Sequence, residues 1–368
     1  MMLNDEHIML RDVATRWVHD RAPVAAFRKV DTGVGGSGWD RTLFAEMAEL
    51  GFTGILCPES EGGADLGCVG MGVVLEALGR NLVASPLLSS AMIGASALQL
   101  GGSAEQKERW LGRIVDGSCI VALAVDEGPR HRPDHIELRA KANGDGWSLT
   151  GRKNAVIDGM QADLLIVAAR ADADTALFLV EANAAGICRK PLERVDGRSA
   201  AIIDFADVRV TKDTMLTGGA SLLEMLLDRA RAGLAAEMLG GALQAFETTV
   251  DYLKIRSQFG QIIGSFQALQ HRAAHLFGEL QLARAAVTGA LAALDADDGE
   301  IPMRVSLAKA LAGETFMLAA KEMVQMHGGI GMTEEHDAGL YLKRAMAANE
   351  TWGNAAFHRE RFGRLTGH

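Results

Sequence analysis

Two long segments with helical spacing, 222–254 and 266–283, are joined by a short connection in the C-terminal part of the chain. The first is rich in alanine and glycine, so it is apolar on most faces and suits close burial between other helices. The second repeats apolar residues every three to four positions. Two more helical segments follow, over 305–327 and from Tyr341 to about Arg364. Long helices with short connections imply a helical bundle.

The pattern changes in the middle of the chain. Between residues 119 and 220, short apolar runs alternate with Gly, Asp, Asn or Pro, which is typical of strands in an antiparallel sheet. The first 118 residues have helical spacing again, including a capping box that begins at Ser103. A chain of 368 residues is long enough for two or three domains. We therefore predict an N-terminal helical domain (1–118), a middle β domain (119–220) and a C-terminal helical bundle (221–368).

The composition excludes several classes of protein. The formal net charge is −10 and there is no run of Lys or Arg, so neither nucleic acid nor an anionic membrane surface is an expected partner. Four cysteines lie far apart, without the paired spacing of metal ligands, and are expected to be reduced and mostly buried: Cys57, Cys68, Cys119 and Cys188. Neither a signal-peptide pattern nor an apolar run of membrane-spanning length is present, so we expect a cytoplasmic protein.

The connection between the first two bundle helices carries the most suggestive residue pattern. Residues 252–267 contain Arg256, Phe259 and two glycines. One cation and one aromatic ring in a turn between long helices can hold a planar, anionic ligand. The alternative is an ordinary turn with a solvated arginine. On the pattern alone this alternative is favoured, because short motifs often match by chance.

Several local sequences resemble those of acyl-CoA dehydrogenases. The segment Gly51-Phe-Thr-Gly-Ile-Leu-Cys-Pro-Glu-Ser-Glu-Gly-Gly63 resembles the N-terminal connector of that family, and Glu76-Ala-Leu-Gly-Arg80 and Gln106-Lys-Glu-Arg-Trp-Leu111 resemble its next helices. Residues 252–267 resemble its Arg-x-x-Phe-Gly…Phe-Gln signature, and Gln325-Met-His-Gly-Gly-Ile-Gly331 resembles its C-terminal glycine signature. The resemblance covers nearly the whole chain.

The resemblance implies a mainly α fold with a central antiparallel β-barrel or sandwich domain and a C-terminal four-helix bundle. It implies an FAD enzyme that oxidises acyl-CoA thioesters to 2,3-enoyl-CoA. A glutamate removes the α-proton, the β-hydrogen passes as hydride to the flavin, and an electron-transferring flavoprotein accepts the electrons. FAD lies between subunits in this family: one subunit's sheet holds the isoalloxazine, and the neighbour's bundle holds the pyrophosphate and adenine end.

The residues that serve the neighbouring subunit match the family. By resemblance they are Arg256, Phe259, Gln267, Gln325, Gly328 and Gly329. A guanidinium pairs with phosphate oxygens in a bidentate manner, and glycine lets backbone amides come close to a ligand. The alternative for the glycines is simple helix termination.

The residues that serve the chain's own site do not match. Asp126 replaces a family threonine in the segment from Val125 to Asp134, and Asp158 replaces the hydroxyl residue of a Trp-Ile-Thr/Ser motif. The two family positions for the catalytic glutamate fall on Trp352 and Ala230.

Two carboxylates lie two residues away from these positions, Glu350 from Trp352 and Asp228 from Ala230. A helix would turn each of them by roughly 200°. We keep Glu350 as the candidate base. The alternative is that Glu350 is a surface or capping residue.

Three hypotheses follow. The first is one subunit of a heteromeric (α2β2) acyl-CoA dehydrogenase, a bacterial type that often acts on bulky acyl groups such as steroid side chains. The second is a self-sufficient homotetramer with a displaced base, Glu350 first and Asp228 second. The third is a non-catalytic scaffold of this fold that binds CoA ligands.

Overall fold

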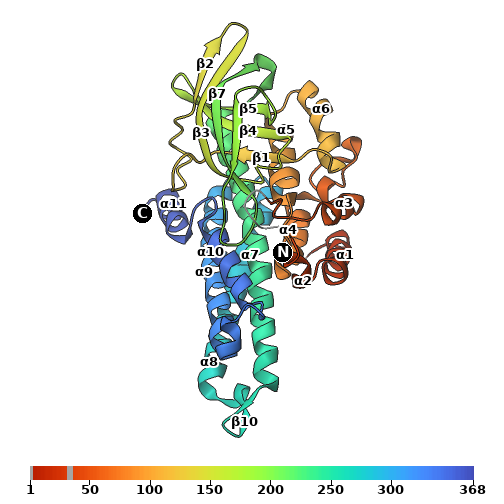
Figure 1. The fold of residues 1–368 in the computed structure, drawn as a ribbon, viewed down its shortest axis with the longest axis vertical. Helices are drawn as coiled ribbons and strands as arrows, with labels where there is room; N and C mark the ends of the chain where they lie inside the picture. Colours follow the sequence, from red (N-terminus) through yellow and green to blue (C-terminus); the bar gives the residue numbers. More distant parts are fainter. Residues whose placement is uncertain (1–2, 31–35) are drawn as a thin grey trace. The chain divides into compact units, whose positions relative to one another are not determined.

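The computed structural model describes residues 3–30 and 36–368 (Figure 1). The chain forms two compact units. One consists of residues 1–28, 68–83 and 231–368, and we call it the helical unit. The other consists of residues 29–67 and 84–230 and contains the large sheet, so we call it the sheet unit.

The large sheet has eight strands in the order β6-β7-β3-β2-β4-β5-β8, with β1 paired to β4. The strands are β1 (Val121–Ala124), β2 (Arg139–Asn143), β3 (Gly146–Ile157), β4 (Leu164–Ala171), β5 (Asp174–Glu181), β6 (Ile187–Pro191), β7 (Ala200–Thr211) and β8 (Met215–Leu216). Most pairs are antiparallel, as predicted, whereas β4 pairs in parallel with both β1 and β2. The sheet is therefore mixed at its centre.

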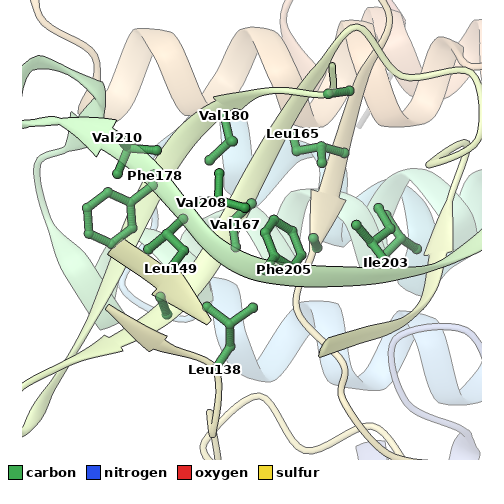
Figure 2. Packing of buried hydrophobic residues seen from close by; sticks show 14 of the residues in the cluster. Leu138, Leu149, Leu165, Val167, Phe178, Val180, Ile203, Phe205, Val208 and Val210 are labelled. Atoms are coloured by element: carbon green, nitrogen blue, oxygen red, sulfur yellow. The ribbon is translucent and has the colours of Figure 1, made fainter. Parts of the chain in front are cut away.

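Burial in the core of the sheet unit explains which strands could be predicted from the sequence. Figure 2 shows Leu149, Val167, Phe178 and Val208 in one apolar cluster, with strands β3, β4, β5 and β7 each contributing. β4 is buried from Leu164 to Ala169, which is why it reads as a continuous apolar run. β6 was not predicted, because this edge strand is half-buried or exposed throughout and ends at a proline.

The other elements of the sheet unit are helices. They are α3 (Arg41–Glu49), η1 (Phe52–Gly54), η2 (Glu59–Glu61), η3 (Leu87–Gly94), α5 (Ala95–Gly101), α6 (Ala104–Val115) and η4 (Lys212–Thr214). The capping box of α6 is confirmed: the Ser103 hydroxyl accepts from Gln106 N at 3.3 Å, and the Gln106 side chain accepts from Ser103 N at 2.9 Å. Helical spacing in the first 118 residues did not distinguish the π-helix η3 from the α-helix α5 that continues it.

The helical unit contains the bundle. Its elements are α1 (Asp5–Arg21), α2 (Val24–Phe27), α4 (Gly67–Arg80), most of α7 (Gly219–Ile255), β9 (Ser257–Gln258), β10 (Gln261–Ile262), η5 (Ile263–Ser265), α8 (Gln267–Asp295), α9 (Ile301–His327), η6 (Gly328–Met332), α10 (Ala338–Glu350) and α11 (Ala355–Thr366). α9 packs against α8, α10 and α11 (Figure 1).

Small residues let α7 approach its neighbour closely, as its composition predicted. A Cβ on Gly240 would lie 1.9 Å from the Glu76 carbonyl oxygen of α4, and one on Gly79 of α4 would lie 2.0 Å from the Glu237 carbonyl oxygen. The two backbones therefore touch where they cross. The predicted fold class, mainly α with a central sheet and a C-terminal bundle, is confirmed. The boundaries at 118 and 220 stay a prediction.

None of the helices in the described ranges is long and apolar enough to cross a membrane.

Candidate functional site

The connection between α7 and α8 is a β-hairpin with a two-residue turn. β9 and β10 pair Gln258 with Gln261, and the turn residues Phe259 and Gly260 have φ of +54° and +78°. Positive φ at both positions defines the type I′ turn, which suits glycine and asparagine and strains phenylalanine. Phe259 is 91% exposed, and its ring makes an edge contact to Phe266 with 6.2 Å between centroids. Neither burial nor backbone preference explains a phenylalanine here.

Arg256 has a fixed backbone and an unused side chain. Its N–H donates to the Tyr252 carbonyl at 3.0 Å, and its own carbonyl accepts from Ile263 N at 2.8 Å. Arg256 is exposed, and within residues 3–30 and 36–368 no polar atom bonds its guanidinium. Gln267, the first residue of α8, is exposed too. The hairpin thus presents a free cation beside an exposed ring.

The glycine turn after α9 contains one glycine that the fold does not require. Gly328 ends the helix with φ +65°, which explains its lack of a side chain. A Cβ on Gly331 would lie 2.6 Å from the Val324 carbonyl oxygen. A Cβ on Gly329, by contrast, would meet nothing within 4 Å. Helix termination therefore accounts for Gly328, and packing for Gly331. Neither accounts for Gly329, and Gln325 one turn earlier is exposed as well.

The structure brings these two segments together. Tyr252, one turn before Arg256, stacks on His327, two residues before Gly329, with 4.3 Å between ring centroids. The predicted cofactor residues therefore form one edge of the helical unit, which we call the clamp edge: Arg256, Phe259, Gln267, Gln325, Gly328 and Gly329. A guanidinium without a bonding partner among the described residues can pair with phosphate oxygens, and an open glycine turn lets the backbone approach a dinucleotide closely.

In the sheet unit, the two carboxylates that follow β1 are both bonded to groups of this unit. The Asp126 carboxylate pairs with His131 Nδ1 at 2.8 Å, and the His131 side chain is only 4% exposed. Glu127 accepts Lys153 Nζ at 2.6 Å and the backbone N–H groups of Glu137 and Leu138 at 2.6 and 2.9 Å. Burial lowers the pKa of Lys153 to about 8 although Glu127 opposes the shift. These carboxylates serve the loop itself.

Asp158, the second replacement in the sheet unit, is also used internally. It follows β3 with φ +57°, is buried, and accepts the Ser89 hydroxyl at 2.5 Å. A flavin edge needs hydrogen-bond donors, and anionic oxygens also oppose the negative charge that a flavin gains on reduction. Asp126 and Asp158 therefore do not fit the isoalloxazine end of FAD.

Trp352 is held tightly at the family position of the base. Its φ is +54°, and the residue is only 6% exposed. The Trp352 carbonyl accepts Arg231 Nε at 3.2 Å and His358 Nε2 at 3.1 Å. Ala230, at the alternative position, is fully buried. Neither position holds a proton acceptor.

A buried lysine fixes the backbone around Trp352. Lys309 Nζ donates to the carbonyls of Ala348, Asn349 and Gly353 at 3.1, 3.1 and 3.0 Å. Burial, together with the charge of Arg231, lowers the pKa of Lys309 to about 7. The same two causes, with Lys309 added, lower the pKa of His358 to about 2, so this imidazole is neutral.

The two displaced carboxylates differ in access. Glu350 is the last residue of α10, is exposed, and accepts the side-chain amides of Asn349 and Asn354 at 3.1 and 3.2 Å. Asp228 is 2% exposed within α7. Glu350 alone is open to solvent, and its assignment as a base stays a prediction.

Comparison with known proteins shows which family the chain belongs to. The family model for the acyl-CoA dehydrogenase N-terminal domain matches residues 4–118, and the model for the C-terminal domain matches residues 217–365. Acyl-CoA dehydrogenase IpdE2 of Mycobacterium tuberculosis is 32% identical over 93% of this chain and 91% of its own length. The chain belongs to the acyl-CoA dehydrogenase family. FadE27 of the same organism is 30% identical over 89% of this chain and 88% of its own.

Solved acyl-CoA dehydrogenase structures are similar over the full chain. The steroid enzyme Tcur3481–Tcur3483 has a TM-score of 0.91 at 32% identity, covering 99% of this chain and 98% of its own. The ChsE4–ChsE5 complex from Mycobacterium tuberculosis has a TM-score of 0.92 at 26% identity, covering 100% and 98%. FAD is the cofactor that membership of the acyl-CoA dehydrogenase family implies, and solved structures of this fold include complexes with FADH2 and with FAD.

Sequence reasoning missed the residues that support this acyl-CoA dehydrogenase site. Lys309 carried a readable signal, because it is a charged residue between Ala308 and Ala310 on a helix of apolar spacing. Ser89 and Tyr252 carried none, since their partners lie 69 and 75 residues away along the chain.

Replacing Phe259 by asparagine separates function from stability. Asparagine tolerates positive φ, so the variant hairpin should gain a few tenths to about 1 kcal/mol. The exposed ring contributes no core packing that could be lost. We expect a raised melting temperature and a lower FAD content in the purified assembly, measured by absorbance. An FAD content equal to wild type would contradict a cofactor role for the ring.

Proposed function

We propose that this chain is one subunit of a heteromeric α2β2, FAD-dependent acyl-CoA dehydrogenase, and that its clamp edge holds the phosphate and adenine end of FAD in the partner's site. One contrast carries the proposal. Among the described residues, the Arg256 guanidinium has no bonding partner and a Cβ on Gly329 would meet nothing within 4 Å, whereas Asp126, Asp158 and Trp352 are bonded within the fold. Two similar solved structures are each named for two chains, and one is a steroid enzyme.

The chain's residues supply contacts to the cofactor but not the catalytic base. When bound, the flavin accepts the β-hydrogen of the acyl-CoA thioester as hydride. Arg256 neutralises phosphate charge, and the open turn at Gly329 lets backbone amides approach. The indole of Trp352 can donate a hydrogen bond but cannot accept a proton. The base that removes the α-proton therefore comes from the partner chain, and an electron-transferring flavoprotein receives the electrons.

Native mass spectrometry tests the composition. The assembly is purified from the native host through a tag on this chain and weighed intact. We expect two copies of this chain and two copies of a second acyl-CoA dehydrogenase chain. A tetramer of this chain alone with FAD on every copy would contradict the proposal.

The exposure of Glu350 supports a second candidate, the self-sufficient homotetramer with Glu350 as a displaced base. In that case Glu350→Gln abolishes flavin reduction by acyl-CoA and leaves the flavin spectrum unchanged. The heteromeric proposal instead predicts wild-type reduction rates for Glu350→Gln, measured by stopped-flow bleaching of the flavin. An assembly without FAD would leave the non-catalytic scaffold as the remaining reading.

A further inference from the structure

Three aromatic rings pack in a row behind the clamp edge. Tyr252 stacks on His327 with an interplanar angle of 28°, and His327 contacts His336 with 4.3 Å between ring centroids. We call these three residues the ring brace. They come from the end of α7, the end of α9 and the segment before α10. The brace thus joins the end of α7 to the segment around the α9 terminus, 75 residues later in the chain.

Hydrogen bonds fix the orientation of the two imidazole rings, and a longer contact joins the Tyr252 hydroxyl to the same turn. His327 Nδ1 donates to the Met323 carbonyl at 2.7 Å, and His336 Nδ1 accepts from Ala338 N at 3.1 Å. The Tyr252 hydroxyl donates to the His327 carbonyl at 3.5 Å. Burial lowers the pKa of His327, so its ring stays neutral at neutral pH. The row therefore contains no buried charge at its centre.

The brace is connected directly to both clamp segments. The Tyr252 carbonyl accepts the Arg256 N–H at 3.0 Å, which closes the last turn of α7. His327 is followed at once by Gly328, and a Cβ on Gly331 would lie 3.1 Å from the His327 Cβ. A shift between the Tyr252 and His327 rings therefore changes the separation of Arg256 and Gly329.

We propose that the ring brace positions the clamp edge, so that Arg256 and Gly329 reach one dinucleotide at the same time. This inference rests on the proposed function. Guanidinium–phosphate pairing and backbone approach tolerate errors of only about 0.5 Å, so two segments on different helices need a rigid spacer. Stacked aromatic rings supply stiffness with few rotatable bonds. None of the three residues contacts the reacting atoms, so they are positioning residues.

The test measures FAD dissociation from the tagged assembly. Tyr252→Leu removes the ring and should raise the FAD dissociation constant about tenfold. Tyr252→Phe keeps the ring and should stay within about twofold of wild type. In an Arg256→Gln background, Tyr252→Leu should change the FAD dissociation constant by less than about twofold, because the guanidinium that Tyr252 positions has already been removed.

A general loss of stability would give a different pattern. In that case the fold-changes of the FAD dissociation constant caused by Tyr252→Leu and Arg256→Gln would multiply in the double variant, and this result would contradict a positioning role for the ring brace. Unchanged FAD binding in Tyr252→Leu would contradict it as well. If Tyr252→Leu fails to fold, His336→Asn replaces it, since the amide oxygen can still accept from Ala338 N. Wild-type assembly without FAD would overturn the proposed function itself, whereas wild-type FAD content with a silent brace variant would overturn only this inference.

Discussion

Arg256→Gln weakens FAD binding by the assembly roughly 30- to 150-fold, which corresponds to about 2–3 kcal/mol for charge-assisted bonds to phosphate. The free energy of unfolding of the chain stays within about 0.5 kcal/mol of wild type, because the guanidinium has no bonding partner in the part of the chain that the structure describes. Equilibrium titration with FAD and chemical denaturation measure the two quantities separately.

Lys254→Gln is the matched control for this prediction. Lys254 lies two residues before Arg256 and pairs with Asp251 at 2.9 Å on the helix surface. Its replacement removes the same charge from the same helix end and should leave FAD binding unchanged. Equal losses in both variants would show that general electrostatic attraction, rather than a phosphate contact by Arg256, holds the cofactor.

Gly329→Ala extends the test to the second clamp segment. A methyl group there would meet no atom of the described residues within 4 Å, so stability should not fall, but the methyl would stand between the turn and a bound dinucleotide. Gly112→Ala in α6, which also points into open space, is the control. It should gain about 0.5–1 kcal/mol from helix propensity and keep its FAD.

Lys309→Met is expected to have the largest effect on stability, and the effect depends on pH. The pKa of Lys309 is about 7 in the fold, well below its ordinary value of 10.5. The folded chain thus releases this proton at lower pH than the unfolded chain. The free energy of unfolding of the wild type therefore rises between pH 7 and 10.5, by up to about 1.4 kcal/mol per pH unit.

The variant should lose this rise, because methionine does not titrate. At pH 9 it should be less stable by about 2–4 kcal/mol, because the neutral amine still donates two N–H bonds among the three surrounding carbonyls and methionine donates none. Below pH 7 the difference should shrink, because the wild type then buries an ammonium group. Lys321→Met, on the exposed side of the same helix, is the control. A pH profile shared by wild type and Lys309→Met would show that Lys309 does not titrate as described.

Helical and strand spacing predicted the architecture well, because periodicity reports directly on burial. The Ser103 capping box and the close crossing of α7 follow from local residue chemistry, and the structure has both of them. β6 escaped because an edge strand need not be apolar. The parallel pairs of β4 depend on contacts between distant segments, which local patterns do not encode.

The candidate site was predictable only where a motif is continuous. Arg256 and Gly329 were identified from their motifs, and the structure adds the ring contact that brings them together. The sequence also showed that Asp126 and Asp158 depart from the family pattern. It did not show what these carboxylates do, because His131 and Ser89 become partners only in the fold.

The ratio of FAD to protein distinguishes a partner-type subunit from a self-sufficient enzyme. We expect this chain purified alone to contain no stoichiometric FAD, and the assembly purified through it to contain one FAD for every two chains. The measurement combines flavin absorbance with amino-acid analysis of the same sample. One FAD on every copy of the chain purified alone, reducible by acyl-CoA, would show instead that this chain has a complete site of its own.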